Sequence, residues 1–312
     1  MALETNAFTS YTAVGNVEDV SDIIYNIAPH ETPFLSMVER TTAVNKKHEW
    51  QKDDLAAPSS DNAHLEGDTY SAAAITPTVR EYNVCQISKK QPRVTGTQQA
   101  IKHYGRADEM DYQVTKLGKE LRNDIEAAVL SANAMVVGDA TTAPKTAGVE
   151  TWLETNVSRG AGGASGGSGA AITDGTQRTF TEALLKNVLQ SCWQEGGNPD
   201  CVLLGGYLKQ IFSTFTGNAT PFAKAEDKKI VAAAEIYVGD FQELKVVPSR
   251  HVRSRSVLTL QKDMWAVAYL RPIHTEDLAV TGDSKAKEIR AEYSLEARNE
   301  ASSGIIADCL VG

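Results

Sequence analysis

Positive charge is the first thing this sequence has little of. Its 31 Lys and Arg residues are outnumbered by 40 Asp and Glu residues, which leaves a formal net charge of −9 and a pI of about 5.3. Nucleic-acid-binding modules show the opposite balance, with Lys and Arg clustered on one face. The composition therefore excludes tight binding to nucleic acid, and an acidic surface would instead repel phosphate groups.

Motifs for metal binding and catalysis are also missing. The four cysteines form no CxxC pair, and none of the six histidines stands in an HExxH or HxH motif. Zinc sites need such ligands at short spacing. We therefore expect free thiols in a reducing cytoplasm, no metal and no cofactor. Gly205-Gly206 follows a predicted strand but lacks the rest of a phosphate-binding loop. We predict no catalytic residues and no enzyme activity.

Targeting and membrane segments are a further absence. The first residues carry neither the basic nor the apolar region of a signal peptide. No apolar run approaches the roughly 18 residues that a membrane span needs. We expect a protein that is made in the cytoplasm and has no membrane partner.

The N-terminal quarter is built of segments that look unable to fold alone. Residues 1–46 form a polar arm with one short helix predicted over 17–27, before Pro29. Residues 47–90 predict a hairpin with strands over 48–52 and 78–88, and a long Pro-, Gly- and Ser-rich tip between them. An isolated hairpin is only marginally stable. We expect both the arm and the hairpin to pack on something else.

Two periodic segments predict the main body. Apolar residues from Met110 to Ala132 recur at steps of three and four, which predicts a long helix over about 107–135. Alternation over 288–298 predicts a long strand, about 287–298, with one buried face. Between them, the Gly-rich segment 160–170 is typical of a linker. A packed neighbouring subunit is the expected means of holding it still.

Residues 179–270 predict a compact α/β unit. Thr179 and Glu182 fit a capping box at the start of a helix that Gly196 and Gly197 end. A second helix is predicted over 207–215. Short strands are predicted at 201–204, 236–238, 244–247, 257–260 and 265–270.

This order of segments resembles the HK97-type capsid fold of tailed bacteriophages. Four stretches are similar to the SU10-like major capsid proteins, namely residues 15–34, 196–215, 238–260 and 278–306. The resemblance implies an α+β fold with an N-terminal arm (1–46) and an E-loop hairpin (47–90). It implies a P domain (91–178 and 271–312) with the spine helix, and an α/β axial A domain (179–270).

The resemblance also implies a function and partners. The protein would be the major capsid protein, which self-assembles as pentamers and hexamers into the icosahedral shell around double-stranded DNA. Its location would be the virion. Founding members begin with a helical scaffolding segment that this chain lacks, so a separate scaffolding protein is expected. A portal protein, weak non-specific contact with packaged DNA and an optional decoration protein complete the expected partners. No Lys–Asn cross-linking pair is matched, so we predict no covalent chainmail.

Candidate inter-subunit contacts come from two places. Trp50, Tyr70 and Tyr82 lie on the hairpin, and aromatic residues dominate interface energetics; packing within their own subunit is the alternative. Arg250, Arg253 and Arg255 form the one basic cluster. It would be a solvated turn or pair with a neighbour's carboxylates, or contact DNA inside the shell. The alternative function is another virion subunit, such as a decoration or tail protein.

Overall fold

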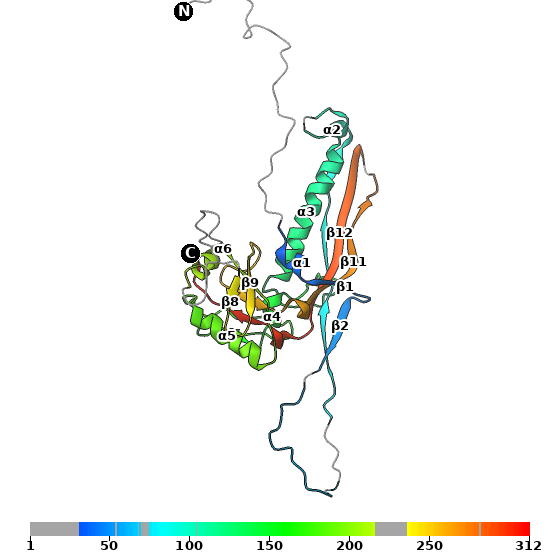
Figure 1. The fold of residues 1–312 in the computed structure, drawn as a ribbon. Helices are drawn as coiled ribbons and strands as arrows, with labels where there is room; N and C mark the ends of the chain where they lie inside the picture. Colours follow the sequence, from blue (N-terminus) through cyan, green and yellow to red (C-terminus); the bar gives the residue numbers. More distant parts are fainter. Residues whose placement is uncertain are drawn as a thin grey trace, which may run out of the picture.

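The computed structural model describes residues 31–53, 55–67, 69, 75–103, 105–215, 236–280 and 282–312. A tall narrow layer of one long helix and long strands stands beside a rounder lobe, and a hairpin extends beyond both (Figure 1). The helix predicted over 17–27 lies outside the described residues. Among those described, the elements are, in order, α1 Pro33–Met37, β1 Glu39–Thr42, β2 Lys47–Lys52, β3 Val79–Val84, β4 Gln86–Lys90, β5 Arg93–Thr95, α2 Gly96–Ala100, α3 Glu109–Val129, α4 Val149–Trp152, β6 Val157–Ser158, α5 Glu182–Gln194, β7 Cys201–Leu204, α6 Gly206–Phe212, β8 Ile236–Val238, β9 Glu243–Pro248, β10 Val257–Leu260, β11 Trp265–Asp277, β12 Ser284–Ala297 and β13 Gly304–Ile306.

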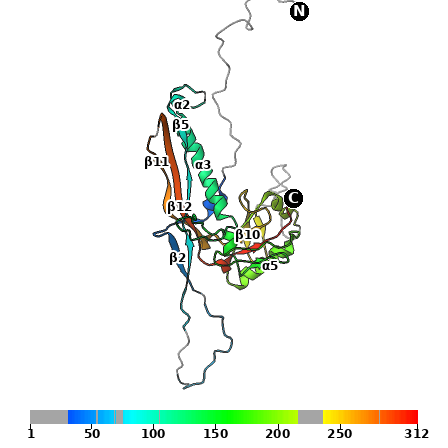
Figure 2. The same cartoon turned by 180° about the vertical axis from the view of Figure 1, so that it is seen from behind.

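The tall layer combines α3 with a sheet of order β1-β11-β12-β4, in which β5 also pairs with β12. Helix α3 lies along β12 and β4 (Figures 1 and 2). Its buried residues Met110, Leu121 and Ile125 belong to the predicted apolar stripe, and Val129 is buried as well. Asp108 caps its start by accepting the Asp111 N–H at 2.9 Å.

Helix α3 ends six residues before the predicted end. The hydroxyl of Ser131 donates to the Ala128 carbonyl at 2.7 Å, which satisfies the last turn. The chain then leaves the helix, and Met135 N–H donates to the carbonyl of Gly169. Backbone pairing with a distant segment has therefore replaced the last predicted turns, a tertiary effect that periodicity does not report.

The rounder lobe is a six-stranded sheet of order β6-β13-β10-β7-β9-β8 with α5 and α6. This lobe has a hydrophobic core separate from the main core of the protomer, and it includes Leu185, Leu204, Phe212 and Tyr237. The expected capping box is wrong, because Thr181 is the N-cap of α5 and its side chain makes no cap hydrogen bond. Glu182 instead accepts a hydrogen bond from the Tyr237 hydroxyl at 3.2 Å.

The Gly-rich segment 160–170 is held by hydrogen bonds within its own chain, so a neighbouring subunit is not required to hold it still. Gly160 N–H donates to the carboxylate of Asp308 at 3.0 Å, and Gly169 N–H donates to the Thr151 carbonyl at 3.2 Å. A Cβ atom on Gly160 would lie 1.9 Å from the Thr176 carbonyl oxygen. Glycine here permits close backbone packing instead of flexibility.

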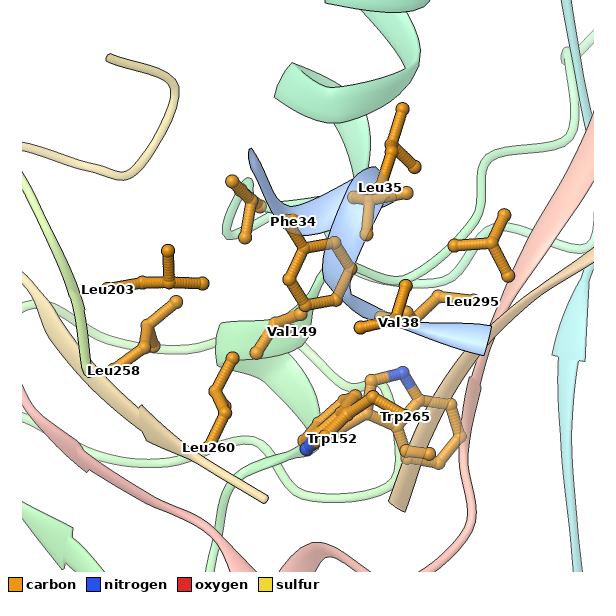
Figure 3. Close-up of a cluster of buried hydrophobic side chains, with 14 of the residues drawn as sticks. Phe34, Leu35, Val38, Val149, Trp152, Leu203, Leu258, Leu260, Trp265 and Leu295 are labelled. Atoms are coloured by element: carbon orange, nitrogen blue, oxygen red, sulfur yellow. The ribbon is translucent and has the colours of Figure 1, made fainter. Parts of the chain in front are cut away.

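The arm from residue 33 onward lies on the body of its own protomer. Phe34, Leu35 and Val38 enter the main core beside Val149 and Trp265 (Figure 3). Strand β1 then pairs in parallel with β11, with Glu39 opposite Ala266. The part of the arm that the structure describes thus packs and pairs within its own protomer.

A buried carboxylate fastens α1 to α3. Glu126 of α3 is completely buried, and its two oxygens accept the backbone N–H groups of Phe34 and Leu35, each at 2.9 Å. Burial raises the pKa of Glu126, and these two hydrogen bonds act in the opposite direction. The contact connects residues more than 90 positions apart in the chain.

We predict that Glu126→Gln destabilises the protomer by about 1–3 kcal/mol, because an amide offers one acceptor to two buried N–H groups. The partly exposed Glu120→Gln on the same helix should cost less than about 0.5 kcal/mol. Denaturant unfolding of dissociated subunits measures both values. Equal losses for the two variants would contradict this role of Glu126.

Candidate assembly surfaces

The hairpin has a fixed base and a tip without a core. Strands β2 and β3 pair from Lys47 opposite Val84 to Lys52 opposite Val79. Beyond that last pair the chain runs away from the body (Figures 1 and 2). Leu55, Leu65 and Ile75 are 99%, 84% and 92% exposed. Large apolar side chains so exposed along one projecting segment indicate a surface that another molecule covers.

The tip is also acidic. From residue 53 to residue 78 the sequence contains five carboxylates and no Lys or Arg, the five being Asp53, Asp54, Asp61, Glu66 and Asp68. The described residues of this stretch form no helix or strand. The tip therefore presents an extended acidic segment with apolar side chains.

Two tryptophans packed at a tilt and an ion pair hold the base of the hairpin. Trp50 is 9% exposed, and its ring centroid lies 5.3 Å from that of Trp152 in α4. Lys52 and Glu81 form a 2.6 Å ion pair across the two strands. The hairpin thus leaves the body in a direction that packing defines.

The predicted second arm of the hairpin is divided into two strands with different partners. Strand β3 pairs with β2, whereas β4 pairs with β12. The division lies beside Asn83, which is buried and donates to the carbonyl of Leu295 at 2.8 Å. Its Oδ1 accepts the backbone N–H of Ala147 at 3.0 Å. These bonds join the hairpin base to the tall sheet, and no pattern in the sequence indicated them.

The six candidate contact residues do not come together in the protomer. Trp50 lies in the core of its own protomer. Tyr82 is half-buried, and the Lys47 ammonium lies over its ring, 4.7 Å from the ring centroid. Arg250 is exposed in the turn between β9 and β10. Tyr70 lies outside the described residues. Their roles between copies stay predictions.

Arg253 and Arg255 already have carboxylate partners in their own chain. Arg253 contacts Glu150 at 2.9 Å and Asp174 at 2.7 Å, and Arg255 contacts Asp174 at 3.1 Å and Asp308 at 2.7 Å. Glu150 and Asp308 are completely buried. Removal of either arginine would leave a buried charge unpaired, which is strongly destabilising. The network therefore holds the segment that contains the Gly-rich loop.

The described residues provide neither a metal site nor a reactive thiol. No group of three or more His, Cys, Asp or Glu residues is placed to hold a metal ion there, and none of its helices has the length and hydropathy to cross a membrane. The four cysteines are free and buried. Burial raises the pKa of Cys85 to about 11 and that of Cys192 to about 12, so both thiols stay protonated at neutral pH.

One short sequence match has no structural counterpart. Residues 163–167 read GASGG and fit the letters of a GxSxG nucleophile elbow. That motif requires a sharp turn from a strand into a helix. Here the segment lies in the long connection between β6 and α5, and the Ser165 hydroxyl accepts a hydrogen bond from Arg159 Nε at 3.1 Å.

A charged cluster joins the hairpin base to β1 and β12. Glu296 of β12 contacts His48 Nε2 at 3.1 Å, the Thr41 hydroxyl at 3.0 Å and Arg298 Nε at 3.0 Å. Arg298 also pairs with Glu39 at 2.7 Å. Burial disfavours the ionised form of Glu296, but these hydrogen bonds outweigh burial and lower its pKa to about 2.

The folded architecture is shared with solved phage capsids. The capsid of cyanophage A-1(L) aligns with a TM-score of 0.67 at 15% identity, covering 97% of this chain and 99% of the other. The capsid of a native GTA particle aligns with a TM-score of 0.65 at 10% identity, covering 96% and 97% of the two chains. The arm, projecting hairpin, long helix and rounder lobe define an HK97-type capsid protein.

The sequence identifies the family more narrowly. Residues 4–309 match the model of the SU10 major capsid protein family, so the chain belongs to that family. The major capsid protein of Escherichia phage Phieco32 is 25% identical over 344 residues, with 96% of each chain covered. The chain is therefore a phage major capsid protein, a structural subunit that associates with copies of itself in the shell of the virion.

We predict that the Glu296 cluster stabilises the protomer at neutral pH but not in acid. A carboxylate whose pKa falls from 4.5 to about 2 on folding stabilises the folded state above pH 4.5, and this contribution disappears as the pH falls to about 2. Glu296→Gln should cost about 2–3 kcal/mol at pH 7, and its deficit relative to the wild type should shrink across that range.

Denaturant unfolding at a series of pH values measures this deficit, and the exposed Glu243→Gln on β9 is the matched control. A deficit of the same size at pH 7 and pH 2.5 would contradict the assignment of the low pKa to this cluster.

Proposed function

We propose that this chain builds the icosahedral head that encloses the double-stranded DNA genome of a tailed phage. Copies would assemble as pentamers and hexamers with the help of a separate scaffolding protein, and a portal protein would occupy one vertex. The observation that carries the proposal is the projecting hairpin tip, whose Leu55, Leu65 and Ile75 are exposed in the protomer. A solitary protomer would leave this apolar surface in water.

We assign the parts of the chain accordingly. Residues 1–46 are the arm, 47–90 the E-loop, 91–178 with 271–312 the P domain, and 179–270 the A domain. These bounds do not follow the two sheets everywhere, because β6 and β13 pair in the sheet of the rounder lobe and β11 of the tall sheet begins at Trp265. The Trp50–Trp152 contact and the β2–β3 pairing support a hairpin base that belongs to its own subunit. The exposed tip beyond Lys52 supports a segment that reaches a neighbour. Contacts of this kind are heterologous and close into rings around an axis.

The proposed shell depends on many weak contacts rather than a few strong ones. Each tip offers only a short segment, so one pairwise interface is small by the standard of stable complexes. Multivalent closure then stabilises the shell as a whole. The net charge of −9 supports a lumen to which packaged DNA binds weakly and without sequence specificity. The role is structural, and no reaction is proposed.

We predict that deletion of residues 54–76 leaves a folded protomer that forms no shells. The deleted residues contribute no helix, strand or core residue among those described, so the fold should survive while contacts between copies are lost. Circular dichroism and denaturant unfolding check the fold. Electron microscopy of the chain expressed with its scaffolding protein checks assembly.

The matched control is a loop of full length in which polar residues Ser59, Ser60 and Asn62 are changed to alanine, and it should assemble normally. Normal shells from the deletion variant would contradict the E-loop assignment. Tubes or isolated protomers from the wild-type chain would favour the alternative of a tail or decoration subunit.

A further inference from the structure

The exposed face of α3 carries a band of positive charge. Lys116, Lys119 and Arg122 follow one another at steps of three and are all exposed, so they are neighbours on the helix surface. With a rise of about 1.5 Å per residue, the three span about 9 Å of the helix axis. The other face of α3 packs on β12 and β4 (Figures 1 and 2). The three cations therefore face solvent in the protomer.

No carboxylate of the described residues neutralises this band. In the ranges that the structure describes, Lys116 and Lys119 form no ion pair, and Arg122 makes only a long hydrogen bond of 3.5 Å to the Thr32 hydroxyl. Like charges at neighbouring positions of a helix repel one another. The band therefore favours a negatively charged partner.

The carboxylates on α3 itself are engaged elsewhere. Lys90 of β4 pairs with Asp124 at 2.8 Å and with Glu120 at 3.9 Å, on the side of the helix that faces the sheet. The two oxygens of Glu126 accept two backbone N–H groups of α1. Asp111 lies in the first turn, where it interacts favourably with the helix dipole. The charge of the band is thus left for another molecule.

Arg40 of β1 extends the band beyond the helix. Arg40 and Arg122 line the same hollow between β1 and α3. Arg40 is exposed, and it forms no ion pair within the described part of the chain. Guanidinium groups bind phosphate oxygens through paired hydrogen bonds. Four cations therefore share one surface of a chain whose net charge is −9.

The helical part of this surface lacks what a stable protein interface needs. None of the large apolar side chains that are exposed among the described residues lies on α3. Interfaces between proteins have an apolar core within a polar rim, whereas contacts to the DNA backbone use cations and polar groups and carry no sequence information. The band thus suits phosphate groups better than a protein surface.

We infer that Lys116, Lys119, Arg122 and Arg40 contact the phosphate backbone of the packaged duplex DNA. This inference rests on the proposed function and names the surface that meets the DNA. Duplex DNA carries one charge for about every 1.7 Å of its axis, so a band of about 9 Å meets several phosphates at once. The contact of one protomer is weak, and many copies in a shell act on the same DNA molecule.

The basic cluster that the sequence singled out is less suited to this role. Arg253 and Arg255 are already paired with carboxylates of their own chain. Of that cluster, Arg250 is the exposed residue. A single cation contributes little to binding of DNA, whereas the band on α3 and β1 has four.

The test measures the binding of a short fluorescent DNA duplex to dissociated full-length subunits across a series of salt concentrations. The variant combines Lys116→Gln, Lys119→Gln and Arg122→Gln. Each lost phosphate contact makes the slope of log K against log salt less steep by about 0.9, so the triple variant should lose about 2.7 of the wild-type slope. Its affinity at low salt should fall at least about tenfold. An unchanged slope would overturn the inference.

The matched control combines Lys46→Gln, Lys145→Gln and Lys245→Gln. These lysines are exposed and lie outside α3 and β1, and the variant has the same net charge as the first. It should keep the wild-type slope. A loss equal to that of the first variant would show that net charge and not the band determines binding, which would overturn the inference. Circular dichroism should report a folded protomer for both variants, since the changed side chains are exposed.

Assembly without DNA separates a nucleic-acid partner from a protein partner. The Lys116→Gln, Lys119→Gln, Arg122→Gln chain should form empty shells with the scaffolding protein as the wild type does, because no DNA is present. Loss of these shells would assign the band to the scaffolding protein or to a neighbouring copy and would overturn the inference.

Electron cryomicroscopy of DNA-filled particles tests the same contact in the assembled state. The outermost layer of DNA should lie against α3. A helix α3 that faces the outside of the shell, or that protein covers, would overturn the inference while the proposed function stood. Failure of the wild-type chain to form shells would contradict the proposed function itself, whereas the salt slope of free subunits tests the inference separately.

Discussion

The structure depends on one constraint, which is that the apolar side chains of the hairpin tip have no core of their own. Leu55, Leu65 and Ile75 are almost fully exposed, and burial of one such side chain is worth about 1.5–3 kcal/mol. A protomer in water cannot realise this free energy. Association between copies can bury these side chains. The acidic residues of the tip add negative charge, which favours contact with a positive surface.

The rest of the fold makes that association less costly by holding the base of the hairpin in place. Trp50 packs on Trp152, His48 bonds to Glu296, and Asn83 bonds to the backbone of β12 and of the segment before α4. Glu126 fastens the adjacent α1. A segment whose direction is already defined loses less conformational entropy on binding than a free chain does.

Periodicity predicted the elements that depend on local pattern. The apolar stripe of α3, the long strand β12 and the short strands β7, β8 and β10 all appear where the residues place them. The prediction that β12 has only one buried face is wrong, because Glu288, Glu292 and Glu296 on its polar face are also buried. The bonds from Glu126 to Phe34 and from Arg253 to Glu150 could not be predicted, because they join residues 92 and 103 positions apart. The same holds for the Gly-rich segment, because its Gly160 bonds to Asp308, which lies 148 positions away in the chain. Of the candidate contacts, the sequence identified the hairpin but not the exposed leucines of its tip.

Hydrogen exchange at the hairpin tip tests the central claim most directly. The account predicts that backbone amides of residues 55–67 exchange at nearly unprotected rates in the dissociated protomer and at least about a hundredfold more slowly in assembled shells, as expected for amides that become covered and bonded. The amides of β12 should be slow in both states. Equal, rapid exchange of the tip in both states would show that no copy covers it and would contradict the account.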